Sequence, residues 1–413
     1  MTAMQRALGA IAFLALAIAS LTVASARTWT DATGKFRMEA ELVSANDSQV
    51  VLKTTDGREL TVPLAQLSRN DRVYLARIKA AGTDAPTEPT EPTGSDSATD
   101  SPNAIPMGTP GQNPAPGQSN EDANGPQYGE PVTLTIVKGV RITTPGGARG
   151  VTATFPIPAT WPEQAVEELQ TDHPASVQRA GTRDLPGGSQ QIVLSIPLMK
   201  AGEVAEVANT YRVQRRPIEP PADTSRLQRP PRPVGELRQY LGASPGIQTA
   251  NTRFRKTAEE IAAGEVEGWA LVKKTFDWVR ANMKYVGGEL RGALWAAEHG
   301  QGDCEEYTSL FIALSRANGV PARAVWVPGH CYAEFYLEDA SGRGWWFPCD
   351  ALQENEPGRL RRTLPILQKG DSFEVPELRG KQRYLSESLT ARDVGRGAPP
   401  QLEAILRNAD AAP

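Results

Sequence analysis

The sequence predicts an α+β chain in which β-rich regions precede a mixed region that carries a cysteine helix. Three observations predict this class. Up to about residue 216, several segments alternate apolar and polar residues, which is the period of half-buried strands. After about residue 225 the apolar spacing becomes helical. Two alternating segments return after residue 328, so we expect a helix packed on an antiparallel sheet in the last region.

Residues 1–26 have the order of a secretory signal peptide. Arg6 precedes an apolar run from Ala7 to Val23, and small residues follow at 24–26. We expect cleavage after Ala26 and an exported chain, located in the periplasm, at the cell surface or outside the cell. An uncleaved anchor stays open as the alternative, because the run approaches the length of a membrane span. No later segment is apolar enough to predict a transmembrane helix.

Residues 80–129 predict a disordered linker. They are rich in Pro, Thr, Ser, Gly, Asp and Glu, and such a composition cannot bury enough apolar surface to offset the entropy of ordering. Residues 80–137 hold eight of the 48 acidic residues and none of the 44 basic ones. The rest of the chain is therefore nearly neutral, and we expect no nucleic-acid partner.

Residues 27–79 predict a small β domain. KFRMEAEL alternates, QVVLKTT and ELTVPL follow as strands, and Asp56-Gly57 between them suits a hairpin turn. LSRNDRVYLARI predicts a short helix with Ser68 as its N-cap. A core of this size suits an SH3-like barrel.

The pattern RTWTD…GKF…AELV…VVLK…DGRELTVPLAQLSRNDRVYL resembles the Sla homology domain one, an SH3-like domain of a yeast endocytic adaptor that is also found in exported bacterial proteins. The resemblance covers nearly all of residues 27–79. In the adaptor this domain binds a short peptide, so a peptide or surface ligand is one interpretation here. A spacer or surface-attachment domain is the other, and the resemblance assigns no binding residues.

Residues 130–218 predict a small antiparallel β-sandwich. VTLTIV, GVTATFPI and QQIVLSIPL alternate or are rich in β-branched residues, with glycine-rich turns between them, and AEVANTYRV suits a closing strand. His173 lies in the loop-like segment TDHPAS, and we expect it at the surface.

Residues 219–400 predict the mixed domain, with residues 401–413 as a tail. Trp269, Val272, Phe276 and Val279 fall at helical spacing and predict one apolar helix face. Residues 303–319 predict a second amphipathic helix with Asp303 as N-cap, Glu306 at N3 and Gly319 at the C-terminus.

Cys304 is then the first residue of that helix. Unpaired backbone N–H groups and the positive end of the helix dipole lie beside its sulfur, and both favour the thiolate. The neighbouring carboxylates oppose ionisation, so a base is still needed. The chain has only three histidines, and His299 and His330 are the candidates.

His330 lies in the strand-like segment GHCYAEFYL, on the polar face of its alternation. GWWFPCD follows as a second strand. If the two strands pair about Ala340, His330 faces Asp350 and Cys331 faces Cys349. This register predicts a nucleophile, a base and an orienting carboxylate: Cys304, His330 and Asp350.

GQGDCEEYTSLFIALSRANGVPARAVWV, GHCYAEFYL and GWWFPCD together resemble the transglutaminase-like core of papain-type cysteine enzymes, over about residues 265–352. The resemblance implies that Cys304, His330 and Asp350 are the catalytic triad. A papain-like protease proper would place its histidine roughly 130 residues after the cysteine, whereas the gap here is 26 residues. The backbone N–H of Cys304 is one expected oxyanion donor, and the second is unassigned.

These residues predict acyl transfer or hydrolysis on protein or peptide amide groups through a Cys304 thioester, without cofactor or metal. A zinc site from Cys304, His330, Cys331 and Cys349 is disfavoured, because adjacent strand residues point to opposite faces and no C-x-x-C spacing exists. Water and a primary amine both stay open as acceptors. The alternative function is a non-catalytic binding scaffold at the cell surface. Cys331 and Cys349 predict either a cross-strand disulfide or two buried thiols.

Overall fold

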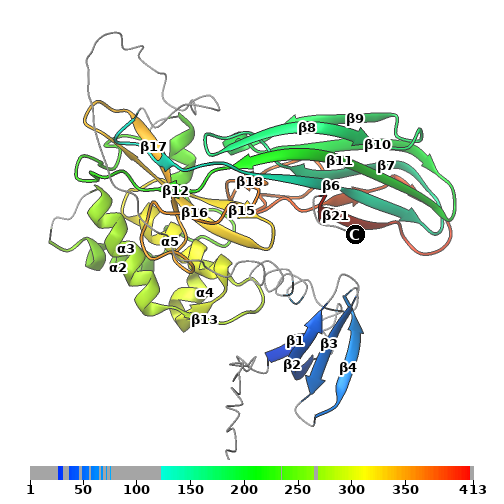
Figure 1. The fold of residues 1–413 in the computed structure, drawn as a ribbon, viewed down its shortest axis with the longest axis horizontal. Coiled ribbons are helices and arrows are strands. Elements are labelled where there is room, and N and C mark those ends of the chain that lie inside the picture. The colour runs from blue at the N-terminus through cyan, green and yellow to red at the C-terminus, as the bar shows by residue number, and fades with distance from the viewer. Residues whose placement is uncertain are drawn as a thin grey trace, which may run out of the picture. The chain divides into compact units, whose positions relative to one another are not determined.

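The computed structural model describes residues 27–30, 37–45, 49–54, 57–64, 67, 71, 75, 122–233, 235–264 and 268–409. The predicted signal peptide and most of the predicted linker lie outside these residues. The chain divides into two compact units, Met1–Pro86 and Thr87–Pro413 (Figure 1). In the described part of the chain, no helix has both the length and the apolar character that crossing a membrane requires.

The first unit contains one antiparallel sheet with strands in sequence order. Its strands are β1 (Arg27–Thr30), β2 (Arg37–Ala45), β3 (Gln49–Thr54) and β4 (Glu59–Pro63). Trp29 is 1% exposed and donates its indole N–H to the Ala40 carbonyl oxygen. Gly57 has a φ of 85° in the predicted β3–β4 turn. No pairing of β1 with β4 occurs among the described residues, and Ser68, the expected N-cap, lies outside them.

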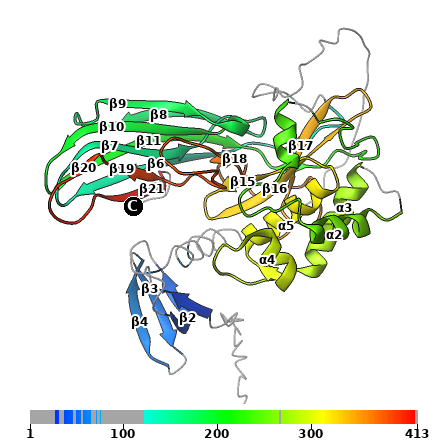
Figure 2. The same ribbon diagram turned by 180° about the vertical axis from the view of Figure 1, so that it is seen from behind.

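The second unit begins with the predicted sandwich. Its strands up to residue 215 are β6 (Val132–Thr144), β7 (Ala148–Ile157), β8 (Gln164–Asp172), β9 (Arg179–Asp184), β10 (Gln190–Met199) and β11 (Glu203–Arg215). They form two sheets, in the orders β7-β10-β9 and β6-β11-β8 (Figure 2). β11 is therefore a central strand, where we expected a closing one. Valine, isoleucine and leucine side chains from both sheets form a common core.

The end of the chain returns to this sandwich and corrects two expected boundaries. β19 (Ser388–Thr390) and β20 (Asp393–Val394) pair with β7, and β21 (Gln401–Asn408) pairs with β6 along its whole length (Figure 2). We expected residues up to 400 in the mixed domain and 401–413 as a tail. The physical reason for the difference is that β6 would otherwise be an unpaired sheet edge.

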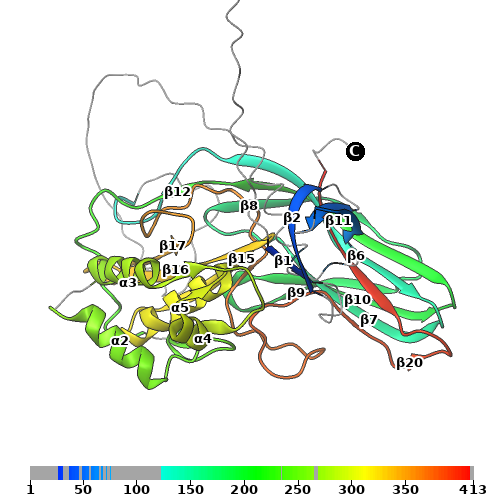
Figure 3. The same cartoon turned by 90° about the horizontal axis from the view of Figure 1, so that it is seen from below.

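Among its described residues, the mixed region contains four helices, which lie on one face of an antiparallel sheet (Figure 3). The helices are α2 (Thr252–Ala262), α3 (Gly268–Asn282), α4 (Gly292–His299) and α5 (Cys304–Ala317). The sheet order is β17 (Gly344–Cys349), β16 (His330–Glu338), β15 (Ala322–Val327) and β18 (Gln368–Lys369). The predicted apolar face of α3 is buried in this core, where Trp269 packs edge-on against Phe335 and Phe347. The sequence did not lead us to expect α4.

The opposite face of this sheet packs on the end of the sandwich. An apolar cluster joins Trp161, Val325, Tyr332 and Ile366 there. Buried charges lie beside it: Lys369 Nζ is 2.5 Å from a carboxylate oxygen of Glu163, at the start of β8, and 2.5 Å from one of Glu334, on β16. Arg323 Nε lies 2.8 Å from the same Glu334 side chain. The face that the alternation marks as polar is therefore buried, and its charges are paired across the two parts of the unit.

The smaller elements complete these two regions. They are strands β5 (Gln127–Tyr128), β12 (Ile218–Glu219), β13 (Lys284–Tyr285) and β14 (Gln301–Gly302), with 3-10 helices η2 (Pro186–Gly188) and η3 (Gly235–Leu241).

Candidate active site

Cys304 is the first residue of α5, as predicted, and its thiol is 2% exposed. Asp303 is the N-cap: its carboxylate accepts the Glu305 N–H at 2.8 Å. Glu306 closes the capping box by accepting the Asp303 N–H at 3.2 Å. The helix ends at Ala317 with Asn318 as the C-cap, one residue earlier than the expected cap Gly319, which follows with a φ of 75°. The sulfur therefore lies at the positive end of a 14-residue helix.

Glu306 also holds the segment in front of the cysteine. Its other carboxylate oxygen accepts the N–H groups of Arg291 at 2.8 Å and Gly292 at 3.1 Å, where α4 begins. β13 pairs in parallel with β14, so the backbone before Cys304 is fixed on its other side as well. One buried carboxylate thus joins the starts of two helices and fixes the turn that positions the thiol.

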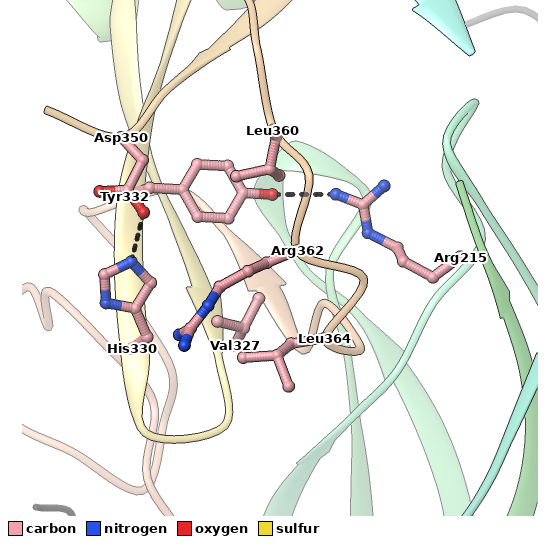
Figure 4. A pocket seen from close by; sticks show the side chains of 8 residues that line it. All are labelled: Arg215, Val327, His330, Tyr332, Asp350, Leu360, Arg362 and Leu364. Atoms are coloured by element: carbon pink, nitrogen blue, oxygen red, sulfur yellow. Dashed lines mark hydrogen bonds and ion pairs between the residues drawn. The ribbon is translucent and has the colours of Figure 1, made fainter. Parts of the chain in front are cut away.

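His330 begins β16 after a two-residue turn, Pro328-Gly329, in which Gly329 has a φ of 69°. Asp350 follows the last residue of β17. Their side chains meet, with His330 Nε2 at 2.6 Å from Asp350 Oδ2 (Figure 4). Asp350 Oδ1 accepts the N–H groups of Leu352 and Gln353, which fixes the carboxylate.

The register that brings them together differs from the predicted one by two residues. Ala333 pairs with Cys349, so the strands pair about Ser341 and not Ala340. His330 and Asp350 are consequently diagonal neighbours and not directly opposite. Because side chains alternate with a period of two, a shift of two residues leaves both on the same face.

The two nitrogens of His330 have different environments. A carboxylate only accepts hydrogen bonds, so Nε2 donates to Asp350. Nδ1 is buried and has no hydrogen-bond partner by geometry. Burial lowers the pKa of His330, but the charge and hydrogen bond of Asp350, followed by the interaction with the Cys304 thiol, raise it to about 10. The ring therefore favours the imidazolium form near neutral pH, with Nδ1 as the nitrogen left for Cys304.

Thr308 connects the cysteine helix to the histidine strand. It lies one turn after Cys304, and its hydroxyl donates to the Cys331 carbonyl oxygen at 3.2 Å. α5 packs on the face of β16 that carries Cys331, whereas we expected the face of His330 to turn toward Cys304. The Cys304 thiol nevertheless interacts with the His330 imidazole, and His330 is the first residue of its strand.

Acidic groups near the thiol have raised pKa values. Burial, then the negative charge of the Cys304 thiolate, raise the pKa of Asp303 to about 8. Burial also raises the pKa of Glu305, and Arg383 opposes that change through a 2.7 Å ion pair. These carboxylates oppose the thiolate, as the sequence suggested, while the helix terminus and His330 favour it.

None of the three cysteines forms a disulfide. The predicted bridge between Cys331 and Cys349 is replaced by two buried thiols, the other alternative. The register is the reason, because Cys349 faces Ala333. Burial raises the pKa of both thiols well above the ordinary value.

The other histidines lie away from this pair. His299 ends α4, where its ring stacks on Trp295 at 4.4 Å and its Nδ1 lies 2.9 Å from the Trp295 carbonyl oxygen. His173 is exposed beside Pro174. Among the residues that the structure describes, no three or more His, Cys, Asp or Glu side chains group as a metal site would require.

A small pocket lies beside His330 and Asp350 (Figure 4). Tyr332, Arg215 and Arg362 complete its polar lining, and Val327, Leu360 and Leu364 form the apolar part. Figure 4 shows the second nitrogen of His330 directed away from this pocket. Sequence analysis missed the pocket, because Arg215 ends a sandwich strand and only the fold brings it to the sheet that carries His330. The basic run Arg359–Arg362 was the one available signal.

The fold and the arranged side chains are those of a transglutaminase-like domain. Residues 255–351 match the model of the Transglutaminase-like superfamily. Residues 21–82 match the model of SLA1 homology domain 1. The chain therefore combines a transglutaminase-like domain with an N-terminal SLA1 homology domain, as the two resemblances predict.

The similar proteins cover these domains unequally. The chain is 43% identical over 49 residues to the actin cytoskeleton-regulatory complex protein sla1 of Schizosaccharomyces pombe, and this match spans 12% of the chain and only 4% of that protein. A candidate cysteine protease from Cytophaga hutchinsonii is 17% identical, with a TM-score of 0.46 over 70% of this chain and 94% of its own. The periplasmic domain of TgpA from Pseudomonas aeruginosa is 15% identical, with a TM-score of 0.28 over 53% of this chain and 88% of its own.

Proposed function

We propose that this protein is an exported cysteine enzyme that transfers or hydrolyses acyl groups of protein or peptide amides through a thioester on Cys304. The observation that carries the proposal is the His330–Asp350 pair. Asp350 holds Nε2 at 2.6 Å and leaves the buried Nδ1 of an imidazole whose pKa is raised to about 10. Such a ring stabilises a thiolate at a helix N-terminus.

The reaction begins with the Cys304 thiolate and the His330 imidazolium. The sulfur attacks the carbonyl carbon of the amide, and the carbonyl oxygen becomes an oxyanion near the N-terminal N–H groups of α5. His330 Nδ1 then gives its proton to the leaving amine, the C–N bond breaks, and a thioester remains. A water molecule or a primary amine loses a proton to Nδ1 and attacks the thioester, which releases the acyl product and restores the thiolate.

Export is proposed from the N-terminal sequence, where the apolar run and the small residues at 24–26 predict signal cleavage. Mass spectrometry of the protein recovered from cells tests it: we expect a mature N-terminus at Arg27. A peptide or surface ligand of the SLA1 homology domain is proposed from the resemblance alone. The resemblance to the adaptor domain assigns no ligand-binding residues in this chain.

The test of the enzyme proposal is product analysis with the full-length protein. A glutamine-containing peptide is incubated with and without a primary amine, and mass spectrometry distinguishes cleavage, deamidation and amine addition. We expect one of these products from the native protein and none from Cys304→Ala. Cys349→Ala is the matched control, because it removes a buried thiol outside the proposed triad and should retain the product.

Two results would argue for the scaffold alternative instead. One is an unchanged product yield in Cys304→Ala. The other is Cys304 alkylation no faster than that of a model thiol at neutral pH, together with no acyl-enzyme mass under any donor.

A further inference from the structure

Cys331 lies on β16 against the first turns of the cysteine helix. The hydroxyl of Thr308 donates to the Cys331 carbonyl oxygen at 3.2 Å, and the same hydroxyl oxygen lies 3.7 Å from Cys331 Sγ. Residues four apart on a helix have Cβ atoms about 5–6 Å from each other on one face, so Cys304 and Thr308 face the same part of the strand. Cys304 and Cys331 are each 2% exposed and belong to one apolar cluster. The contacts of Thr308 therefore bring the two cysteines together.

The two thiols also interact with each other. The Cys331 thiol donates a hydrogen bond to the sulfur of Cys304. Burial, then this hydrogen bond and the charge of the Cys304 thiolate, raise the pKa of Cys331 well above its ordinary value. Cys304 thus has two partners, the His330 imidazole and the Cys331 thiol. The acyl transfer proposed above uses only the imidazole, so the second thiol is left without a role in it.

A thiolate next to a second thiol has a characteristic chemistry with oxidants. Hydroperoxides convert a thiolate to a sulfenic acid, and a neighbouring thiol can trap that acid as a disulfide. Without a neighbouring thiol, oxidation continues to the sulfinic and sulfonic acids, which thiol reductants do not reverse. The N-terminal sequence predicts export to an oxidising compartment, where such damage would disable a thiolate enzyme.

We propose that Cys331 is a resolving cysteine, which traps Cys304 oxidised by a hydroperoxide as a reversible Cys304–Cys331 disulfide. The Cys304 thiolate attacks one peroxide oxygen, the O–O bond breaks, and the leaving oxygen takes up a proton. The sulfur has then lost two electrons and carries a hydroxyl group. Cys331 sulfur attacks Cys304 sulfur, the S–S bond forms, and the hydroxyl group leaves with the Cys331 proton as water. Two molecules of a small thiol reverse the modification by exchange and leave as their own disulfide.

Oxidation of Cys304 itself favours the second step. The thiolate charge is one cause of the raised pKa of Cys331, and the sulfenic acid does not carry that charge. Cys331 therefore ionises more readily after Cys304 has been oxidised than before. Cys349 provides the comparison, because it is an equally buried thiol whose pKa responds, after burial, to Asp350 and Arg280. We accordingly expect Cys331, and not Cys349, to form the disulfide.

The test is treatment of the full-length protein with hydrogen peroxide, the smallest hydroperoxide, because Cys304 is almost fully buried. Mass spectrometry of the intact protein and its peptides should show the loss of two hydrogen atoms and a link between Cys304 and Cys331. Dithiothreitol should restore the alkylation of Cys304 by iodoacetamide. In Cys331→Ala we expect sulfinic or sulfonic acid on Cys304 and a recovery at least about tenfold lower. Cys349→Ala is the matched control, since it removes the other buried thiol and should behave like the native protein.

The linkage in the native protein decides the proposal by itself, even if Cys331→Ala does not fold. The inference is overturned if peroxide leaves Cys304 unmodified, if Cys304 becomes a sulfinic acid while Cys331 stays a free thiol, or if Cys304 links to Cys349. Full recovery of a folded Cys331→Ala would also overturn it. The readout is a mass and not a turnover rate. A protein that forms the disulfide and has no enzyme activity would therefore contradict the proposed function and support this inference.

Discussion

Asp350→Asn separates the charge of the carboxylate from its shape. The asparagine oxygen can still accept the N–H groups of Leu352 and Gln353, so the loop after β17 is retained. What is lost is the negative charge 2.6 Å from His330 Nε2. Burial then dominates and lowers the pKa of His330 from about 10, so that the imidazole is neutral at pH 7.

The expected magnitude follows from the thiolate fraction. With a protonated imidazole beside it, Cys304 is ionised at neutral pH. Without that partner, an ordinary thiol of pKa about 8.5 is only ~3% thiolate at pH 7. Alkylation of Cys304 by iodoacetamide should therefore slow about 30-fold at pH 7 in Asp350→Asn, and more if burial raises the thiol pKa further.

The assay is the alkylation rate of Cys304 between pH 5 and 10, read by peptide mass spectrometry. The native rate should stay nearly flat through neutral pH and change only as His330 deprotonates near pH 10, while the Asp350→Asn rate should rise with pH. Because the folded-state pKa lies above the ordinary 6.5, the pair's stabilising effect is complete below about pH 6.5 and is lost as the pH rises through 10. Asp277→Asn, on the exposed side of α3, is the control. An Asp350→Asn profile that overlays the native one would refute the reasoning.

Three further predictions concern stability. Glu306→Gln weakens the buried acceptor of three backbone N–H groups and should lower the free energy of unfolding by about 2–4 kcal/mol, measured by denaturant titration; a loss below about 0.5 kcal/mol would contradict the role of Glu306 in joining the starts of α4 and α5. Gly302→Ala places a Cβ 2.3 Å from the Glu306 Cβ and should lower Tm, whereas Gly181→Ala, with open space around it, should not; equal Tm values would rule out the close approach. Lys369→Met leaves two buried carboxylates without their cation and should lower the free energy of unfolding by about 3–5 kcal/mol. Lys273→Met, at the surface, should lower it by about 0.5 kcal/mol or less. Similar losses in the two variants would show that burial does not determine how much the ion pair stabilises the fold.

Local patterns were sufficient to predict the cysteine helix. The helical spacing of its apolar residues gave its extent, and the Asp303–Glu306 capping box, three residues apart, gave its start. The strand faces of His330 and Asp350 were predictable for a different reason. Side chains on a strand return to the same face every two residues, so an error of two residues in the predicted register leaves each side chain on the correct face. The same error changes which residue lies directly opposite. Cys331 and Cys349 are therefore not paired and form no disulfide, whereas the side chains of His330 and Asp350 still meet as diagonal neighbours.

Features that depend on the packing of the two parts were not predictable. β8 and β9 are mostly exposed, so their sequences lack the apolar alternation that marks a strand. Arg215 and Glu163 lie on sandwich segments with no local sign that they would meet the sheet that carries His330. Residues 401–408 carry only two partly buried apolar side chains, Leu402 and Ile405, and the edge of β6 decides their conformation.

The return of β21 to β6 makes the order of synthesis matter. The sheet that begins at Val132 receives its last strand only after the residues of the cysteine helix and its partners have been made. A chain that grows from its N-terminus therefore holds the sandwich incomplete, with β6 as an exposed edge, until Gln401–Asn408 is available. Completion of the sandwich is therefore a late event, and a chain that stops short of β21 would be recognisable to quality control by its open edge.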